Sequence, residues 1–127
     1  MRNKTLLLVE DNPSDVDLTR RALQRNRIAN ELVVVEDGQE ALDYLFGGGK
    51  YAARNIADLP TLILLDIKLP RVDGLEVLAR IRADERTRRL PVVILTSSHE
   101  ERDIAASYDL GATSYVRKPV DFNQFNE

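Results

Sequence analysis

The chain alternates short runs of aliphatic residues with longer segments in which apolar residues recur every three or four positions. The short runs have the length of buried β-strands, whereas the longer spacing is typical of amphipathic α-helices. Regular alternation of the two predicts an α/β fold, with a parallel sheet whose crossover helices cover both faces. The predicted strands are residues 5–9, 32–35, 62–66, 92–95 and 114–116.

The third aliphatic run, residues 62–66, lies between Pro60 and Pro70 and ends in Asp66. A short unbroken apolar run is typical of a strand that is buried on both faces at the centre of a parallel sheet. In open α/β sheets, ligands bind in the crevice beyond the carboxyl ends of the strands. Asp66 is therefore a candidate functional residue, although a single acid after a strand is more often a helix cap.

The helix boundaries are marked by capping residues. Asn12 followed by Pro13 favours a helix start, and the first helix is predicted over residues 14–26. Its expected core positions are Val16, Leu18, Ala22 and Leu23. Further helices are predicted after Asp37, after Gly74, over residues 100–109 and after Asp121, the last of them truncated because only residues 122–127 follow.

Composition limits the classes of function. Lys and Arg total 18 against 21 for Asp and Glu, and the net charge of −3 provides no basic excess for direct binding of nucleic acid. No apolar run has the length of a signal peptide or a membrane span. The absence of cysteine excludes disulfides and thiolate zinc sites and favours a cytoplasmic location. The length suits a single domain over residues 1–127.

Polar residues follow four of the predicted strands. Glu10 and Asp11 come after the first strand, Asp66 ends the third, Thr96 follows the fourth and Lys118 follows the fifth. A flavodoxin-like sheet, the centre of a three-layer α/β/α sandwich with strand order 2-1-3-4-5, places strands one and three side by side at the topological switch point. We therefore expect the three acids to share one crevice, with Thr96 and Lys118 entering it from adjacent strands.

Three carboxylates in one crevice require a cation, because each pair at 4 Å repels by about 4 kcal/mol at an effective dielectric constant of 20. Oxygen ligands without His or Cys favour a hard ion, and Mg²⁺ is the abundant intracellular choice. The Lys118 ammonium and the Thr96 hydroxyl suit phosphoryl oxygens. The set predicts a phosphoryl-transfer site in which Asp66, from the central strand, is the nucleophile and forms an aspartyl phosphate.

At these positions the sequence resembles the receiver domain of two-component response regulators. The matching segments are residues 8–12, 64–70 with Asp73-Gly74, 94–98 and 111–119, which together cover the chain in order. The resemblance implies a response regulator in which a histidine kinase phosphorylates Asp66. The protein would then be a signalling phosphoacceptor that catalyses its own phosphorylation and dephosphorylation, not a conventional enzyme.

The resemblance also implies roles for individual residues. Glu10, Asp11, Asp66 and the backbone carbonyl of Lys68 would hold Mg²⁺, and Lys118 would contact the phosphate. Thr96 and Tyr115 would be the switch residues, and the bond between Lys118 and Pro119 is often cis in this family. A downstream protein partner is implied, together with a homodimer through the fourth helix, the fifth strand and the fifth helix.

The connection over residues 47–59 is longer than the usual ~2–6 residues between a helix and a strand. With residues 107–111 and 120–122, it is most similar to stand-alone receivers that partner bacterial phytochrome-type histidine kinases. Its sequence Gly47-Gly48-Gly49-Lys50 is not a phosphate-binding loop, because it follows a helix and Tyr51 replaces the required Ser or Thr.

Two other functions use the same fold. An aspartate-nucleophile phosphohydrolase would share Asp66, the metal and Lys118, but such enzymes usually carry a second Asp where this chain has Lys68. A flavin-binding module would share the topology, but the acids would repel the flavin phosphate. Five arginines are expected to form a solvated face, with contact to a partner as the alternative: Arg80, Arg82, Arg86, Arg88 and Arg89.

Overall fold

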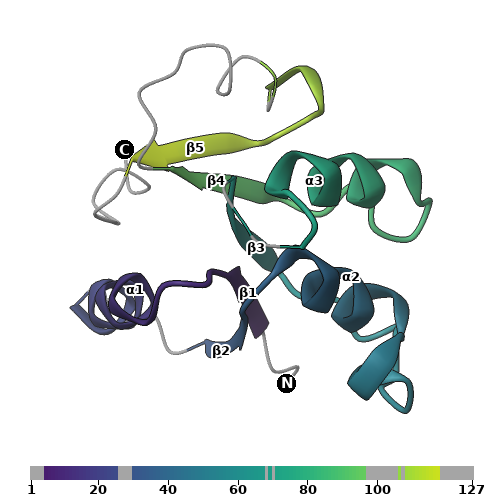
Figure 1. Ribbon diagram of the computed structural model, residues 1–127, viewed down its shortest axis with the longest axis horizontal. Helices are drawn as coiled ribbons and strands as arrows, with labels where there is room; N and C mark the ends of the chain where they lie inside the picture. The colour runs from purple at the N-terminus through teal and green to yellow at the C-terminus, as the bar shows by residue number, and fades with distance from the viewer. Residues whose placement is uncertain are drawn as a thin grey trace.

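The computed structural model describes residues 5–25, 30–67, 69, 71–96, 106 and 108–117. In this part of the chain, parallel strands form a sheet of order β2-β1-β3-β4-β5, which confirms the predicted flavodoxin-like order (Figure 1). The strands are β1 (Thr5–Val9), β2 (Glu31–Val35), β3 (Leu62–Asp66), β4 (Val92–Thr96) and β5 (Ser114–Arg117). The helices are α1 (Pro13–Arg25), α2 (Gly38–Phe46) and α3 (Gly74–Ala83), with a 3₁₀ turn η1 (Gly49–Tyr51).

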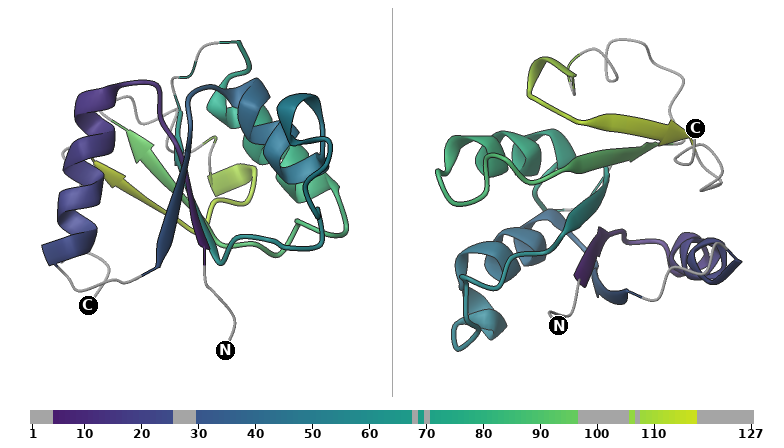
Figure 2. Two further views of the ribbon diagram at one scale, coloured as in Figure 1. Left: turned by 90° about the horizontal axis from the view of Figure 1, so that it is seen from below. Right: turned by 180° about the vertical axis from the view of Figure 1, so that it is seen from behind.

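The helices divide between the two faces of the sheet. Figure 2 shows α1 on one face and α2 with α3 on the other. Alternate strand residues follow the same division: Leu7 and Ile63 join the core under α2 and α3, whereas Leu8 and Leu64 join the core under α1. Because both faces are covered, the central strands require apolar residues at consecutive positions, which explains their unbroken aliphatic sequence.

Strand β3 lies between β1 and β4, with Leu64 aligned with Leu8 on one side and with Val93 on the other. Its residues Ile63 and Leu65 are fully buried. Burial of an aliphatic side chain stabilises the fold by roughly 1.5–3 kcal/mol, so this strand is held firmly in register. The residue that ends it therefore has a fixed position at the edge of the sheet.

The predicted caps of the first two helices are confirmed. Asn12 Oδ1 accepts a hydrogen bond from the Ser14 backbone N–H at 2.9 Å, at the start of α1. The Asp37 backbone is extended, and its Oδ1 accepts from the Glu40 N–H at 2.7 Å. Gly47 closes α2 in the left-handed conformation, with φ of 79°.

The core face of α1 differs from the prediction at one position. Ala22 and Leu23 are buried as expected, and Val16 is partly buried. Leu18, however, is 40% exposed, and Thr19 occupies the buried face instead. Positions 16, 19 and 23 follow the three-and-four spacing of one helical face, whereas position 18 lies outside that face. The Thr19 hydroxyl donates to the Asp15 carbonyl, so this polar group is satisfied inside the core.

Helix α3 packs on the sheet through Val77, Leu78 and Ile81, which are fully buried. Most of the predicted fourth helix and all of the predicted fifth lie outside the described residues. The same holds for the bond between Lys118 and Pro119. Among the residues that the structure describes, no helix is long and apolar enough to cross a bilayer.

The long connection between α2 and β3 is held by side-chain hydrogen bonds. The Arg54 guanidinium donates to the carbonyls of Tyr44 and Asp58 and stacks on the Tyr44 ring at 3.8 Å. The Tyr51 hydroxyl donates to Glu40 Oε2 at 2.8 Å. The connection is therefore an organised structure attached to α2.

Two of the five arginines expected on a solvated face instead join separate elements. Arg86 donates to the carbonyls of Ile56 and Leu45, at 2.6 and 2.8 Å, and so ties the long connection to the segment after α3. Arg82 donates to the carbonyls of Gly111 and Leu90, both at 2.8 Å. The prediction of a uniformly solvated face is therefore wrong at these two positions.

Candidate functional site

Two acids follow directly after β1. The Glu10 N–H donates to the Val35 carbonyl at 2.9 Å, which continues the pairing between β1 and β2 by one residue. Glu10 is 1% exposed, and its Oε2 accepts from the Asn12 N–H at 3.3 Å. Asp11 is exposed. The end of β1 thus provides one buried carboxylate and one that is open to solvent.

Asp66 is the last residue of β3 and is 6% exposed. Its backbone is aligned with Leu95 in β4. The start of α3 packs directly against it, because a Cβ atom at Gly74 would lie 2.2 Å from the Asp66 carbonyl oxygen. The Gly74 N–H donates to the Ile67 carbonyl at 2.9 Å. Only glycine permits this approach, so the contact with Gly74 helps to fix the backbone position of Asp66.

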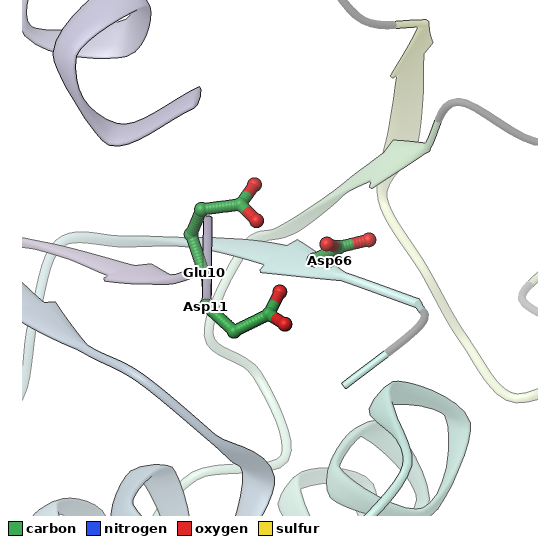
Figure 3. A group of neighbouring side chains, drawn as sticks. All are labelled: Glu10, Asp11 and Asp66. Carbon is green, nitrogen blue, oxygen red and sulfur yellow. The ribbon is translucent and has the colours of Figure 1, made fainter. Parts of the chain in front are cut away.

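The three carboxylates lie together, as predicted. One oxygen from each of Glu10, Asp11 and Asp66 lies within 4.8 Å of the others, and Figure 3 shows the three groups gathered beyond the ends of β1 and β3. Oxygens bound to one Mg²⁺ at ~2.0–2.1 Å are at most about 4.2 Å apart, and this ion usually keeps several waters. An all-oxygen set within 4.8 Å exceeds this limit by at most about 0.6 Å, so side-chain shifts of that size would let the three carboxylates, two of them buried, hold a hard divalent cation.

The other predicted site residues are described less completely. The backbone places Thr96 at the end of β4, aligned with Arg117, and Tyr115 in β5, aligned with Ile94. Both strands end at the same edge of the sheet as β1 and β3, because all of these strands are parallel. Lys68 and Lys118 lie outside the described residues, so their predicted roles stay predictions.

Sequence reasoning missed a second interaction beside this cluster. Arg71 Nη1 lies 3.3 Å from Asp37 Oδ2, which joins the segment after β3 to the start of α2. A Cβ atom at Gly38 would lie 1.8 Å from the Val72 carbonyl oxygen, so the two elements are in backbone contact. The sequence predicts only a helix that starts after Asp37, and it predicts no role for Arg71.

A doubly wound sheet with three acids at its switch point places the oxygen ligands that a hard divalent cation prefers at the carboxyl ends of its strands. Residues 6–127 match the family described as response regulator receiver domain. The chain belongs to this family and is a two-component signalling protein. The family assignment agrees with the position of the acidic cluster at the carboxyl edge of the sheet.

Within the family, the chain is similar to phytochrome-associated response regulators. Response regulator Rcp1 of Synechocystis sp. is 43% identical over 115 residues, which are 91% of this chain and 76% of Rcp1. The crystal structure of Mn²⁺-bound Rcp1 has a TM-score of 0.83 at 40% identity, and the match covers 95% of this chain and 85% of that one.

Two further solved structures are comparably similar. The bacteriophytochrome response regulator AtBRR is 52% identical with a TM-score of 0.89, over 99% of this chain and 89% of its own. The phosphorylated cyanobacterial phytochrome response regulator RcpA is 44% identical with a TM-score of 0.84, over 97% of this chain and 86% of its own.

Proposed function

We propose that this protein accepts a phosphoryl group from a histidine kinase on Asp66 in a Mg²⁺-dependent reaction, and that the modification changes its affinity for a partner. The observation that carries the proposal is the cluster of Glu10, Asp11 and Asp66 at the switch point of the sheet. Repulsion among these carboxylates is relieved by a divalent cation, and a phosphoryl group supplies the remaining anionic ligands. One relative of similar sequence is a Mn²⁺-bound response regulator, and another is phosphorylated.

In the proposed reaction, an Asp66 carboxylate oxygen attacks the phosphorus of the kinase phosphohistidine. The phosphorus–nitrogen bond breaks, and the imidazole leaves with the electron pair of that bond and takes up a proton. Glu10, Asp11, Asp66 and the Lys68 carbonyl would hold Mg²⁺, which when bound neutralises charge on the phosphoryl oxygens. Lys118 would donate to the phosphoryl group. Attack by water on the aspartyl phosphate would restore Asp66.

The conformational signal would pass through Thr96 and Tyr115, the switch positions that the resemblance implies. The Thr96 hydroxyl would bond the phosphoryl group and leave space into which the Tyr115 ring turns. Phosphorylation shifts the population toward an active state only as far as it stabilises that state more than the inactive one. A phosphoryl group contacted by Lys118 and Thr96 provides such a difference.

The proposed partners are a phytochrome-type histidine kinase, a downstream protein and a second copy of the chain. The kinase proposal is supported by the relatives named as phytochrome response regulators. Dimerisation would use the fourth helix, β5 and the fifth helix, and Tyr108 and Leu110, at 46% and 36% exposure, lie beside β5 in sequence. Residues 1–127 would act as one receiver domain in the cytoplasm.

The test is transfer of phosphate from an autophosphorylated bacteriophytochrome histidine kinase to the wild-type chain, Asp66→Asn and Asp58→Asn. Asp58 is an exposed acid in the long connection, so its substitution controls for the loss of one carboxylate. We expect the wild type and Asp58→Asn to be labelled equally and Asp66→Asn not at all. Equal labelling of all three proteins would show that Asp66 is not the acceptor, and rapid turnover of small phosphate esters would favour the phosphohydrolase function.

A further inference from the structure

Arg71 has an unusual backbone conformation close to the acidic cluster. Its φ is 67°, and among the described residues it is the only one other than glycine that has a positive φ. Left-handed backbone is unfavourable for a residue with a Cβ atom and persists only where the surroundings fix it. Arg71 lies between Asp66 and Gly74, on the short connection that carries the chain away from the cluster.

The surroundings that fix Arg71 belong to α2. The two carboxylate oxygens of Asp37 have different partners. Oδ1 accepts a hydrogen bond from the Glu40 N–H and so caps α2, and Oδ2 lies 3.3 Å from Arg71 Nη1. Asp37 is only 16% exposed, whereas Arg71 is 63% exposed. The ion pair thus attaches a partly buried helix cap to a strained position in the connection.

Two glycines bring the same connection against the rest of the fold. Gly38 at the start of α2 contacts the Val72 carbonyl, and Gly74 at the start of α3 contacts the Asp66 carbonyl. The connection is therefore held between the first turns of two helices. At both points backbone lies against backbone, with no side chain between Gly74 and Asp66 or between Gly38 and Val72.

We propose that Arg71 and Asp37 are positioning residues for the divalent-cation site. Their ion pair holds the connection after β3 against α2 and thereby keeps the Asp66 carboxylate within reach of Glu10 and Asp11. This inference rests on the proposed function, since it names residues that support the cation site of that function. Neither residue is a member of the acidic cluster.

Two substitutions break the ion pair while they preserve the local backbone. Arg71→Gly removes the guanidinium, and glycine adopts a φ of 67° without strain. Asp37→Asn removes the charge, and asparagine is as good a helix cap as aspartate. Arg71→Lys keeps the charge. Arg80→Gln is the matched control, because it breaks an exposed ion pair with Glu76 of the same 3.3 Å length on α3.

These two variants also separate positioning from simple electrostatics. Loss of a positive charge at Arg71 would by itself tighten cation binding, whereas loss of a negative charge at Asp37 would weaken it. A positioning role predicts that both variants weaken binding. Because the two residues act as one unit, the double variant should bind Mg²⁺ no more weakly than whichever single variant has the lower Mg²⁺ affinity.

The measurement is the Mg²⁺ dissociation constant of the phosphate-free protein by calorimetry, with urea unfolding in EDTA as a check on folding. We expect Arg71→Gly and Asp37→Asn each to raise the dissociation constant about three- to fivefold, within what a partly exposed ion pair permits. Arg71→Lys should stay within about twofold of the wild type, and Arg80→Gln should match it. The unfolding free energies of Arg71→Gly and Arg80→Gln should both stay within about 1 kcal/mol of the wild type, because in Arg71→Gly the relief of strain at a φ of 67° is offset by the greater freedom of the unfolded chain.

Opposite shifts for Arg71→Gly and Asp37→Asn, unchanged affinity in both, or a strictly additive double variant would overturn the inference. A wild-type protein that binds no Mg²⁺ would overturn it as well. Labelling of Asp66 by a phosphodonor, measured in parallel on the wild type and Asp66→Asn, tests the proposed function separately. Mg²⁺ binding without labelling would reject that function while leaving the positioning result to be judged by the variants.

Discussion

The two connections that flank β3 are built in different ways. The preceding connection, residues 47–61, lies at the amino end of the sheet and is held by long side chains, chiefly Arg54 and Arg86, that donate to backbone carbonyls. The following connection lies at the carboxyl end, and its described residues, 67, 69 and 71–73, are held by backbone contacts at Gly38 and Gly74 and by the ion pair of Arg71 with Asp37. Only the second connection adjoins the acidic cluster.

The two connections should differ in how substitutions within them affect the rest of the fold. A side chain that donates to a carbonyl can adjust over several rotatable bonds, so the long connection can vary without displacing β3. A glycine in contact with a carbonyl oxygen has no such freedom, because the added atom meets backbone. We therefore expect substitutions in the first connection to affect stability alone, and substitutions in the second to affect the cation site as well.

The largest effect is expected from Gly74→Ala. The new Cβ atom would lie 2.2 Å from the Asp66 carbonyl oxygen, which forces the backbone of the site to move. We expect a loss of about 1–3 kcal/mol in unfolding free energy, typical of overpacking, and at least a tenfold weaker Mg²⁺ affinity. Urea unfolding and calorimetry measure the two quantities.

Gly48→Ala is the control from the first connection. Its added atom would meet the Asp43 carboxylate at 2.8 Å, the movable end of a side chain. Mg²⁺ affinity should therefore stay at the wild-type value. Equal losses of affinity in Gly74→Ala and Gly48→Ala would remove the distinction between the two connections.

Arg86→Ala should produce the next largest effect, confined to stability. It removes the hydrogen bonds to Ile56 and Leu45 and the cation–π contact with Phe46, whose ring centroid lies 5.5 Å from the guanidinium. We expect unfolding free energy to fall by about 1.5–2 kcal/mol, at the lower end of the range for hydrogen bonds from charged groups because Arg86 is only partly buried. The rate of Asp66 phosphorylation by a small acyl phosphate should be unchanged, and a slower rate would show that the long connection also supports the site.

The sequence predicts the strands and the acidic cluster, but it does not predict the contacts that hold the connection after β3. The bounds of β1 and β3 and the grouping of Glu10 with Asp66 were predicted, because strand burial and strand order depend on local patterns. The ion pair between Arg71 and Asp37 was not predicted, since it joins residues far apart in the chain. Leu18 was assigned to the wrong face of α1 because Thr19, although polar, satisfies its hydroxyl within its own helix.

A smaller effect is expected from Tyr51→Phe in η1. The variant loses the hydrogen bond from the Tyr51 hydroxyl to Glu40 but keeps the edge-on contact with the Tyr44 ring, whose centroid lies 5.2 Å away. The expected loss of unfolding free energy is about 0.5–1.5 kcal/mol by urea titration. Because Asp37 caps the helix that contains Glu40 and accepts from the Glu40 N–H, an accompanying change in Mg²⁺ affinity would reveal coupling between the two connections.

The smallest effect is the pH dependence contributed by Glu40. Burial raises the pKa of Glu40, but hydrogen bonds from the Glu36 N–H, Lys50 and Tyr51 together lower it by more than burial raises it. The pKa of Glu40 therefore lies below its ordinary value of 4.5. A lowered folded-state pKa contributes stability that is present above the unfolded-state pKa and is lost as pH falls through the folded-state value. The stability difference between the wild type and Glu40→Gln should therefore shrink below about pH 4.5. A constant difference across this range would contradict the assignment.

The central claim is that Asp66 receives a phosphoryl group at a site that needs a divalent cation. The most direct measurement is to incubate the chain with a small acyl phosphate, with Mg²⁺ or with EDTA, to reduce the acyl phosphate with borohydride, and to locate the resulting homoserine by mass spectrometry. The predicted result is modification at Asp66 with Mg²⁺ and none with EDTA. Modification of another residue, or equal modification of Asp66 in both conditions, would contradict the account.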